Sequence, residues 1–419
     1  MTTDTVIIGA GQAGLSLSRH LTRLGHNHVV LERGDVGQRW RSERWDSLRL
    51  LTPNWLNTLE GSPGHADRDG YLASAEFVAY LERYAHSTGA PVQSNVDVVG
   101  VEQESRGFRV RTDAGDWHAA NVVVATGFAD IPHRPPSAVE APRHLHQLDA
   151  ARYRTPSAVP AGGVLVVGSG PSGQQIAAEL RRAGRHVVLA AGRHGRLPRR
   201  YLGQDIWHWL NEIGDVDRVV DNPLERAKLR GGPSLALTGA NGGEQLDLGV
   251  LHRLGVVIAG RLAGFHRGRA LFADDLRTTV VGADDRMRHV LDRIDVHVEA
   301  SGGAQVERDH LPDVRLPDGP RELDLAREGI STVIWATGYR RDYRWLHLPV
   351  LDGGGELEHR RGITPVPGLY ALGLKFQHRK SSHQISGVSR DAWFIATHIA
   401  TAAALRPPRP PEQRYAAAA

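Results

Sequence analysis

The chain has 419 residues, of which 41% are apolar and 23% charged, and its formal net charge is +4. This composition is that of a globular protein with one or two domains, and no apolar run is long enough to cross a bilayer. The absence of cysteine excludes dithiol–disulfide exchange, thiolate-bound iron–sulfur clusters and a cysteine nucleophile.

Other broad features narrow the expected partners. Residues 1–8 lack the basic stretch and apolar core of a secretory signal, so we expect a cytoplasmic protein with no membrane attachment. The basic residues are scattered and are almost all arginine, which argues against a nucleic-acid partner. The histidines do not form an H-E-x-x-H motif, and no metal site is expected. These patterns do not specify an oligomeric state.

The first unit along the chain is a strand, a glycine-rich turn, a helix and a second strand. Residues 5–8 form the buried strand, the turn is Gly9-Ala10-Gly11-Gln12-Ala13-Gly14, the helix ends near Gly25, and the second strand covers 28–32. In a G-x-G-x-x-G turn, Gly9 permits the tight bend, Gly11 lets a pyrophosphate approach, and Gly14 lets helix and strand pack closely. The alternative is a strand–helix turn without a ligand.

Glu32 ends the second strand, where a carboxylate accepts hydrogen bonds from the ribose hydroxyls of an adenosine. The order of strand, turn, helix and distal carboxylate therefore predicts a dinucleotide site. The other residues expected to contact this dinucleotide are Gln12, Ala13, Arg33, Gln38 and Val98. Further along, we expect a helix over 71–88, strands over 96–101 and 108–111, and a proline-rich linker over 131–163.

A second unit of the same kind begins at residue 164. Its strand covers 164–167, the turn comprises Gly168, Ser169, Gly170, Pro171, Ser172 and Gly173, the helix covers 176–183, and the next strand covers 186–190. This internal repetition predicts a second dinucleotide site. Residues 204–325 show a tryptophan-rich helix at 207–209 and otherwise mixed short elements.

No carboxylate ends the strand of the second unit, and basic residues follow instead: Arg193, Arg196, Arg199 and Arg200, with His194 among them. A charge-assisted hydrogen bond stabilises a complex by roughly 1.5–3 kcal/mol, enough to favour a 2′-phosphate by tenfold or more. We therefore expect NADPH rather than NADH, with Arg193 as the best single candidate. The alternative is a solvated basic loop.

Two strands end alike, in Ala125-Thr126-Gly127 and in Ala336-Thr337-Gly338. Small residues at a strand end let the chain turn closely around a bound dinucleotide or pass between domains. An isolated Ala-Thr-Gly carries little information, but the pair occurs here with two G-x-G-x-x-G turns.

Together these motifs resemble the class B flavoprotein monooxygenases, which include flavin-containing, N-hydroxylating and Baeyer–Villiger enzymes. The resemblance covers nearly the whole chain and extends to the tryptophan-rich stretch 40–55 and to Gly368-Leu369-Tyr370-Ala371-Leu372-Gly373. It implies bound FAD, hydride from NADPH, reaction with O₂ to a C4a-(hydro)peroxyflavin, and transfer of one oxygen atom to a small-molecule substrate.

The same resemblance implies site residues. The stretch along the flavin contributes Trp40, Trp45, Asp46, Leu51, Thr52 and Asn54, and the closing segment contributes Gly373 and Gln377. Trp40, Asn54 and Gln377 are the candidate catalytic residues. For Asn54 the alternative is a turn residue after Pro53.

One departure from the family pattern concerns the linker fingerprint F-x-G-x-x-x-H-x-x-x-(Y/W). His146 takes the histidine position, but the phenylalanine and glycine are missing and Tyr153 falls late. We therefore favour oxygenation at nitrogen or sulfur over Baeyer–Villiger oxidation of a ketone. The same motifs also fit an NADPH-dependent flavin reductase that serves a partner or a quinone, and a dinucleotide-binding module without turnover.

The expected architecture is α/β, with two Rossmann-like dinucleotide-binding domains in a glutathione-reductase-like three-layer arrangement. We expect an FAD domain over 1–155 and 326–405, an NADPH domain over 156–325, and a disordered tail over 406–419.

Overall fold

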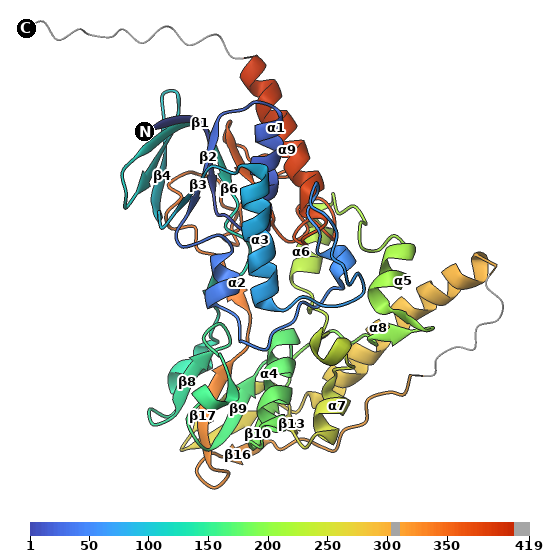
Figure 1. Cartoon of the computed structure of the whole chain (residues 1–419). Coiled ribbons are helices and arrows are strands. Elements are labelled where there is room, and N and C mark those ends of the chain that lie inside the picture. The colour runs from blue at the N-terminus through green and yellow to red at the C-terminus, as the bar shows by residue number, and fades with distance from the viewer. Residues whose placement is uncertain (303–310, 406–419) are drawn as a thin grey trace, which may run out of the picture.

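The computed structural model describes residues 1–302 and 311–405, and the expected tail at 406–419 lies outside them. Two main sheets, each covered by helices, lie one above the other in Figure 1. This arrangement confirms the expected α/β class with two Rossmann-like units.

The first sheet has the strand order β3-β2-β1-β6-β5-β4, with β19 also paired to β6. The central strands β1 (Thr2–Ile8), β2 (His28–Glu32), β6 (Trp117–Val124) and β19 (Leu369–Ala371) run parallel, as does the edge strand β3 (Val92–Ser94). β4 (Val98–Glu104) and β5 (Gly107–Thr112) extend the sheet by antiparallel pairing. The apolar runs of β1 and β6 are buried on both faces, as parallel strands require.

Three helices cover one face of this sheet. α1 (Gln12–Arg23) packs against α9 (Val388–Ala404) and α3 (Ser74–Thr88), which in turn contacts the short α2 (Gln38–Ser42) (Figure 1). The chain leaves α1 through Gly25 at φ +66°, a left-handed conformation that glycine adopts without strain, so the expected helix end is confirmed.

The second sheet has the order β13-β10-β9-β17-β8. All its pairings are parallel, and its strands are β8 (His146–Asp149), β9 (Gly163–Val167), β10 (Val187–Ala190), β13 (Val257–Ala259) and β17 (Ile330–Trp335). α4 (Pro171–Arg182) and α7 (Leu248–Arg253) pack on one side of it. A small sheet of β14 (Leu262–His266), β15 (Arg269–Phe272) and β16 (Glu322–Asp324) covers the other.

Two strands of the second sheet come from segments that we expected to lie outside the second domain. β8 comes from the segment taken as linker and β17 from the segment assigned to the FAD domain, yet both belong to the second sheet. The chain passes between the two sheets at β7 (Ile131–Pro132) and β18 (Tyr339–Arg340), which pair antiparallel. The boundaries that we now propose are therefore near residues 131 and 339. Hydropathy alone did not reveal them, because a short strand is apolar whichever sheet it joins.

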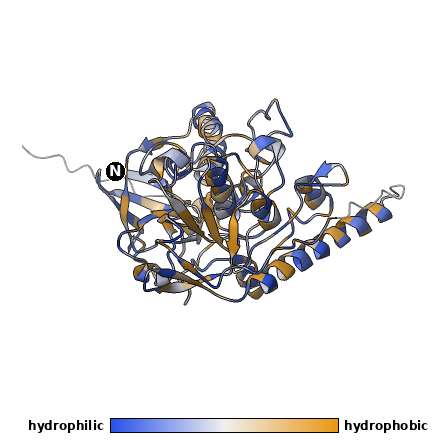
Figure 2. Ribbon diagram, turned by 90° about the horizontal axis from the view of Figure 1, so that it is seen from below, coloured by the Kyte–Doolittle hydropathy of each residue, from blue (hydrophilic) through white to orange (hydrophobic). Residues whose placement is uncertain are grey.

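The region 204–325 contains more helix than its sequence suggested. α5 (Ile206–Glu212) is the expected tryptophan-rich helix, and α6 (Pro223–Arg230) and α8 (Leu276–Ala300) follow it. A short antiparallel hairpin precedes α5, and its strands β11 (Arg200–Tyr201) and β12 (Gln204–Asp205) have two residues each. Figure 2 shows α8 projecting from the body with alternating hydrophobic and hydrophilic turns. Among the described residues, no helix is both long and apolar enough to cross a membrane.

Candidate dinucleotide-binding sites

A cleft of about 570 Å³ lies where the central strands of the first sheet end. Ile8 of β1, Glu32 of β2 and Ala125, just after β6, line it together. The residues expected to bind the first dinucleotide that do line this cleft are Gly9, Gly11, Gln12, Ala13, Glu32, Arg33, Gln38, Trp40, Val98, Ala125, Thr126, Gly127 and Gly373. The carboxyl edge of a parallel sheet is where such folds bind ligands.

The three glycines of the first turn have different surroundings. A Cβ on Gly9, whose φ is +110°, would lie 2.7 Å from the carbonyl oxygen of Ala125, and a Cβ on Gly14 would lie 1.9 Å from the carbonyl oxygen of Gly9. A Cβ on Gly11 would meet no protein atom within 4 Å and would point into free space. Gly9 and Gly14 are therefore needed for packing, whereas Gly11 keeps room for a ligand. We call the glycine turn Gly9–Gly14 the first cradle, and its shape fits a pyrophosphate.

Glu32 is held at the cleft by two backbone hydrogen bonds. Its Oε2 accepts from the amide of Ala10 at 2.7 Å, and its Oε1 accepts from the amide of Gly34 at 3.3 Å. These bonds fix the carboxylate beside the glycine turn, with further lone pairs free to accept from a ribose. Glu32 is the last residue of β2, where the sequence predicted the strand to end.

The second glycine turn repeats the first. A Cβ on Gly168 would lie 2.5 Å from the carbonyl oxygen of Ala336, a Cβ on Gly173 would lie 1.8 Å from that of Gly168, and a Cβ on Gly170 would meet nothing within 4 Å. Each Ala-Thr-Gly segment thus closes against the first glycine of its own unit. The second cradle fits a pyrophosphate by the same test as the first.

The residues around this second turn build it. Pro171 is the first residue of α4, and Ser169 is buried, with its hydroxyl donating to the carbonyl of Gly192 at 2.9 Å. Ser172 lies in the first turn of α4. Beyond Ala336, the segment Thr337-Gly338 leads directly into β18 and so back to the first sheet. The segment Ala336-Thr337-Gly338 thus lies against the second glycine turn and also begins the passage of the chain from the second sheet to the first.

The four arginines after β10 separate into two pairs. Arg196 is buried and ion-paired with Asp247 at 3.2 Å and Asp284 at 2.5 Å. Arg199 is buried, pairs with Asp205 at 2.5 Å and stacks on the ring of Tyr71. Both have structural partners, so the expected basic cluster is smaller than its sequence suggested.

Arg193 and Arg200 are exposed. Arg193 follows Gly192 after the strand, and among the described residues its guanidinium is held by the carbonyl of Gly231 alone, at 2.8 Å. His194 is buried instead, with its Nδ1 at 3.1 Å from the carbonyl oxygen of Gly192. Burial lowers the pKa of His194, so its ring is held neutral and carries no charge for a phosphate.

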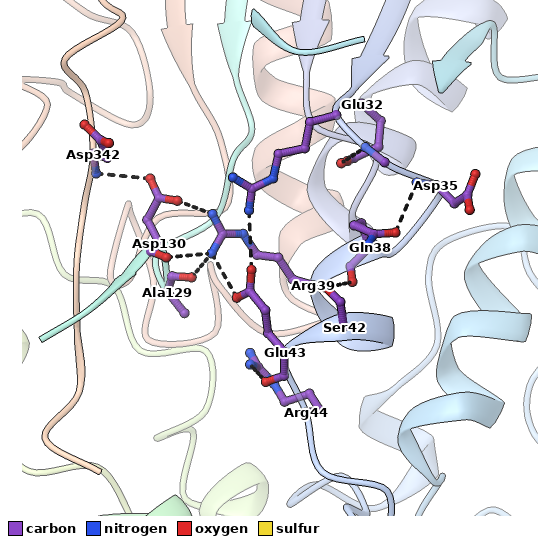
Figure 3. A network of polar contacts seen from close by, with 12 residues as sticks. Glu32, Asp35, Gln38, Arg39, Ser42, Glu43, Arg44, Ala129, Asp130 and Asp342 are labelled. Carbon is purple, nitrogen blue, oxygen red and sulfur yellow. Dashed lines mark hydrogen bonds and ion pairs between the residues drawn. The ribbon is translucent and has the colours of Figure 1, made fainter. Parts of the chain in front are cut away.

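An ion-pair network that the sequence did not indicate lies at the cleft (Figure 3). Arg39 of α2 donates to the carbonyl oxygens of Ala129 and Asp130 and pairs with the carboxylates of Asp130 and Glu43. Asp130 in turn accepts from the amide of Asp342 at 3.0 Å. α2 is thereby joined to both connections between the sheets. No spacing could reveal this, because the three segments are far apart in the sequence.

The stretch 40–54 lies along the cleft only at its start. Trp40 lines the cleft, with its ring edge-on to Phe77 at 5.0 Å. Trp45 is 5% exposed and packs in the core beneath the second sheet, a packing role in place of the expected cofactor contact. Asp46 pairs with Arg154 on the surface at 2.5 Å.

Leu51 and Thr52, further along the stretch, form hydrogen bonds that stabilise the surrounding loops. The carbonyl of Leu51 accepts from Arg199 and from Trp207, and the Thr52 hydroxyl donates to Asn57 at 2.6 Å.

Asn54 is buried and begins a short 3₁₀ turn, and it does not line the cleft. Its Nδ2 donates to the carbonyl of Asp67, and its Oδ1 accepts from the amide of Leu72, both at 2.9 Å. Both ends of the side-chain amide thus bind the loop 67–72. This arrangement corresponds to the turn role, and it does not support the catalytic role that the resemblance implied.

The closing segment places Gly373 against the cleft, where an added Cβ would meet that of Ala13 at 2.8 Å. Gln377 is fully buried below it, and its Oε1 accepts from the amide of Leu374 at 3.3 Å. Its Nε2 has no hydrogen-bond partner among the described residues. Gln377 is not among the residues that line the cleft.

Comparisons with known proteins agree with this geometry. A family described as pyridine nucleotide-disulphide oxidoreductase matches residues 6–212, which include both glycine turns. The chain is 31% identical over 399 residues to an oxidoreductase CzcO-like of Geobacillus kaustophilus, covering 94% of this chain and 98% of that protein. It is 27% identical over 416 residues to the indole-3-pyruvate monooxygenase YUCCA1 of Oryza sativa, covering 94% and 90%.

Among solved structures, a flavin-containing monooxygenase from Stenotrophomonas maltophilia superposes with a TM-score of 0.67 at 22% identity, covering 96% of this chain and 99% of that one. The likeness to that structure shows the shared fold, and the likeness to the Geobacillus protein shows the family. The disulfide chemistry in the name of the matched family is excluded by the absence of cysteine. The chain belongs to the family of the CzcO-like oxidoreductases.

Proposed function

We propose that this enzyme inserts one oxygen atom from O₂ into a small-molecule substrate, at a nitrogen or sulfur atom, with FAD in the first cradle and NADPH in the second. The observation that carries this proposal is the repeated cradle, in which Gly11 and Gly170 each leave room for a ligand. Two such sites in one chain suit an enzyme that brings a nicotinamide and a flavin together. When bound, the two cofactors supply the electrons and activate the oxygen.

The residues of the chain bind and orient these groups. Glu32 and the amides of the first turn hold the adenosine end, and Arg193 stands where a 2′-phosphate would extend from the second cradle. Trp40 and Phe128 present aromatic surface to the cleft and exclude water from it. The Arg39–Asp130 pair ties this wall to the connections between the sheets.

The choice of nitrogen or sulfur is supported by the linker. His146, in the place of the fingerprint histidine, is exposed at the start of β8. Tyr153 is buried, and its hydroxyl donates to Glu179 at 3.0 Å. Neither residue reaches the cleft, so the linker does not supply the groups that the Baeyer–Villiger pattern would require.

The test is oxygen uptake by the purified protein with NADPH, together with the yield of hydrogen peroxide, over a panel of amines, thioethers and ketones. We expect an amine or thioether to raise oxygen uptake, lower peroxide release and gain one oxygen atom. Conversion of a ketone to an ester would show Baeyer–Villiger activity instead. NADPH oxidation by a quinone without any oxygenated product would show a reductase. A protein that binds no FAD would refute all of these.

A further inference from the structure

A group of basic side chains converges behind the cleft, where α6 meets the C-terminal part of the chain. It comprises Arg226, Arg230, Arg341, His359 and Lys375, and we refer to it as the basic recess. Arg226 is 8% exposed, and the side chains of Arg341 and Arg230 are 8% and 24% exposed. His359 is subject to the positive charge of all three arginines, and Lys375 to that of Arg341.

The negative charge near the recess does not balance these groups. Glu356 pairs with Arg341 at 2.5 Å and with Arg230 at 3.3 Å. Asp221 acts on Arg226 from a distance, but it is largely exposed and pairs with His378. Within residues 1–302 and 311–405, the three arginines and the lysine thus share one close carboxylate, that of Glu356. Such an excess of buried charge is costly unless an anion compensates it.

Several donors in the recess have no acceptor. The Nε atoms of Arg226 and Arg230 and the Nη1 of Arg341 are buried without a hydrogen-bond partner among the described residues. The remaining bonds of Arg226 are long, at 3.4 Å to the carbonyls of Val220 and His359. Unpaired guanidinium donors in a buried site are the groups that bind the oxygen atoms of a carboxylate or phosphate.

The recess adjoins the cleft through Lys375. Its ammonium lies 4.7 Å from the ring centre of Phe128, which lines the cleft, and Lys375 follows Gly373 by two residues. No ion pair or hydrogen bond engages that ammonium within the described parts of the chain. Burial lowers the pKa of Lys375, and burial with three arginines lowers the pKa of His359 to about 3, which agrees with uncompensated positive charge.

We propose that the basic recess binds an oxyanion of the substrate, a carboxylate or a phosphate monoester, and so directs the rest of that molecule past Phe128 into the cleft. This inference rests on the proposed function and names the substrate class: organic anions with an oxidisable nitrogen or sulfur. Lys375 and Arg341, whose positive charge acts on Lys375, are the residues expected to contact the oxyanion, and Arg226 adds positive charge to the recess.

The test uses the FAD-loaded protein without NADPH, with binding followed by calorimetry and by the shift in melting temperature. The probes are hexanoate, phenylacetate and phenyl phosphate, the neutral amides hexanamide and phenylacetamide, and inorganic phosphate. The variants are Lys375→Met and Arg226→Gln, with Arg277→Gln on the exposed side of α8 as the matched control. Since Lys375 is the less buried residue, its variant remains informative if Arg226→Gln fails to fold.

We expect at least one organic oxyanion to bind saturably and its amide, where tested, to bind at least tenfold more weakly. Lys375→Met should raise the dissociation constant by about tenfold or more, as the loss of a charge-assisted contact predicts, and Arg277→Gln should leave it unchanged. The proposal is overturned by equal binding of the amides, by inorganic phosphate binding as tightly as the organic anions, by unaltered binding in both recess variants, or by binding of no probe. Because no turnover is measured, a failure to oxygenate substrates would not affect this result.

Discussion

Gly11 and Gly14 lie on the same turn, yet the structure requires them for different reasons. The Cβ of any other residue at position 14 would overlap the carbonyl oxygen of Gly9, whereas at position 11 it would point into the cleft. The same division holds between Gly173 and Gly170 in the second unit. At the residue scale, ligand binding and packing can therefore be separated by mutation.

Gly11→Ala should lower FAD affinity by at least about tenfold while leaving the melting temperature of the apoprotein nearly unchanged. The reason is that the added methyl occupies ligand space and touches no protein atom. FAD content after dialysis and the melting temperature are the measurements. Gly170→Ala is the matched control: it should retain FAD and raise the KM for NADPH. Loss of FAD from Gly170→Ala would contradict the assignment of the two cradles.

Arg193→Ala should reduce kcat/KM for NADPH by about tenfold or more and leave that for NADH within about twofold, because only NADPH carries the 2′-phosphate. Arg196→Ala serves as a contrast. That residue is enclosed by Asp247 and Asp284, so its loss should destabilise the protein by about 3–5 kcal/mol without changing the preference between the two nucleotides. Equal losses with NADPH and NADH in Arg193→Ala would refute the role of Arg193.

Between elements, the segment after α5 is fastened to the segment before α9. Asp215 pairs with Lys380 at 2.5 Å, Asp217 accepts from Ser381 at 2.6 Å and pairs with Arg390, and the amide of Val220 donates to His378 at 2.7 Å. These contacts hold residues 215–220, which belong to the second unit, against residues 378–390 of the first unit.

Acid should loosen this attachment. Burial by itself would raise the pKa values of Asp215 and Asp217, but Lys380 and Arg293, and Ser381 and Arg390, lower them below the ordinary value. A carboxylate with a lowered pKa stabilises the fold above its unfolded pKa of about 4, and that contribution is lost as the pH falls through the folded pKa. Asp217→Asn should lower the urea midpoint at pH 7 and narrow the difference between the midpoints at pH 7 and pH 3.5. An unchanged difference would contradict the role of Asp217.

For the molecule as a whole, two partly buried histidines link stability to mildly acidic pH. Burial is the main cause that lowers the pKa values of His359 and His383 to about 3, and nearby cations act in the same direction. Both rings are therefore neutral in the folded protein, whereas in the unfolded chain they bind a proton below about pH 6.5. The unfolded state then gains protons that the folded state does not, and stability falls as the pH decreases below 6.5.

Between pH 6.5 and pH 5, each histidine should lower the free energy of unfolding by about 2 kcal/mol. The measurement is urea unfolding at several pH values in that range, with saturating FAD. His383→Gln should make the slope against pH shallower whatever its effect on absolute stability. His252→Gln, at the end of α7, is a control that should leave the slope unchanged. A wild-type midpoint independent of pH over this range would show that the rings are charged in the folded state.

The two strand–turn–helix units, their glycines, Glu32 and the two Ala-Thr-Gly segments that accompany them could all be predicted from the amino-acid sequence. These are local patterns in which backbone geometry depends on residues a few positions apart. The sequence also excludes dithiol chemistry, since no cysteine is present.

The remaining features depend on how the chain folds in three dimensions. Folding places β8 and β17 in the second sheet, packs Trp45 in the core and binds the Asn54 amide to the loop 67–72. It also pairs Arg196 and Arg199 with carboxylates, and it brings Arg39 to Asp130 and the basic recess to the cleft. Each of these depends on contacts between residues tens to hundreds of positions apart. Such contacts follow from how the elements pack, and neither periodicity nor residue spacing records them.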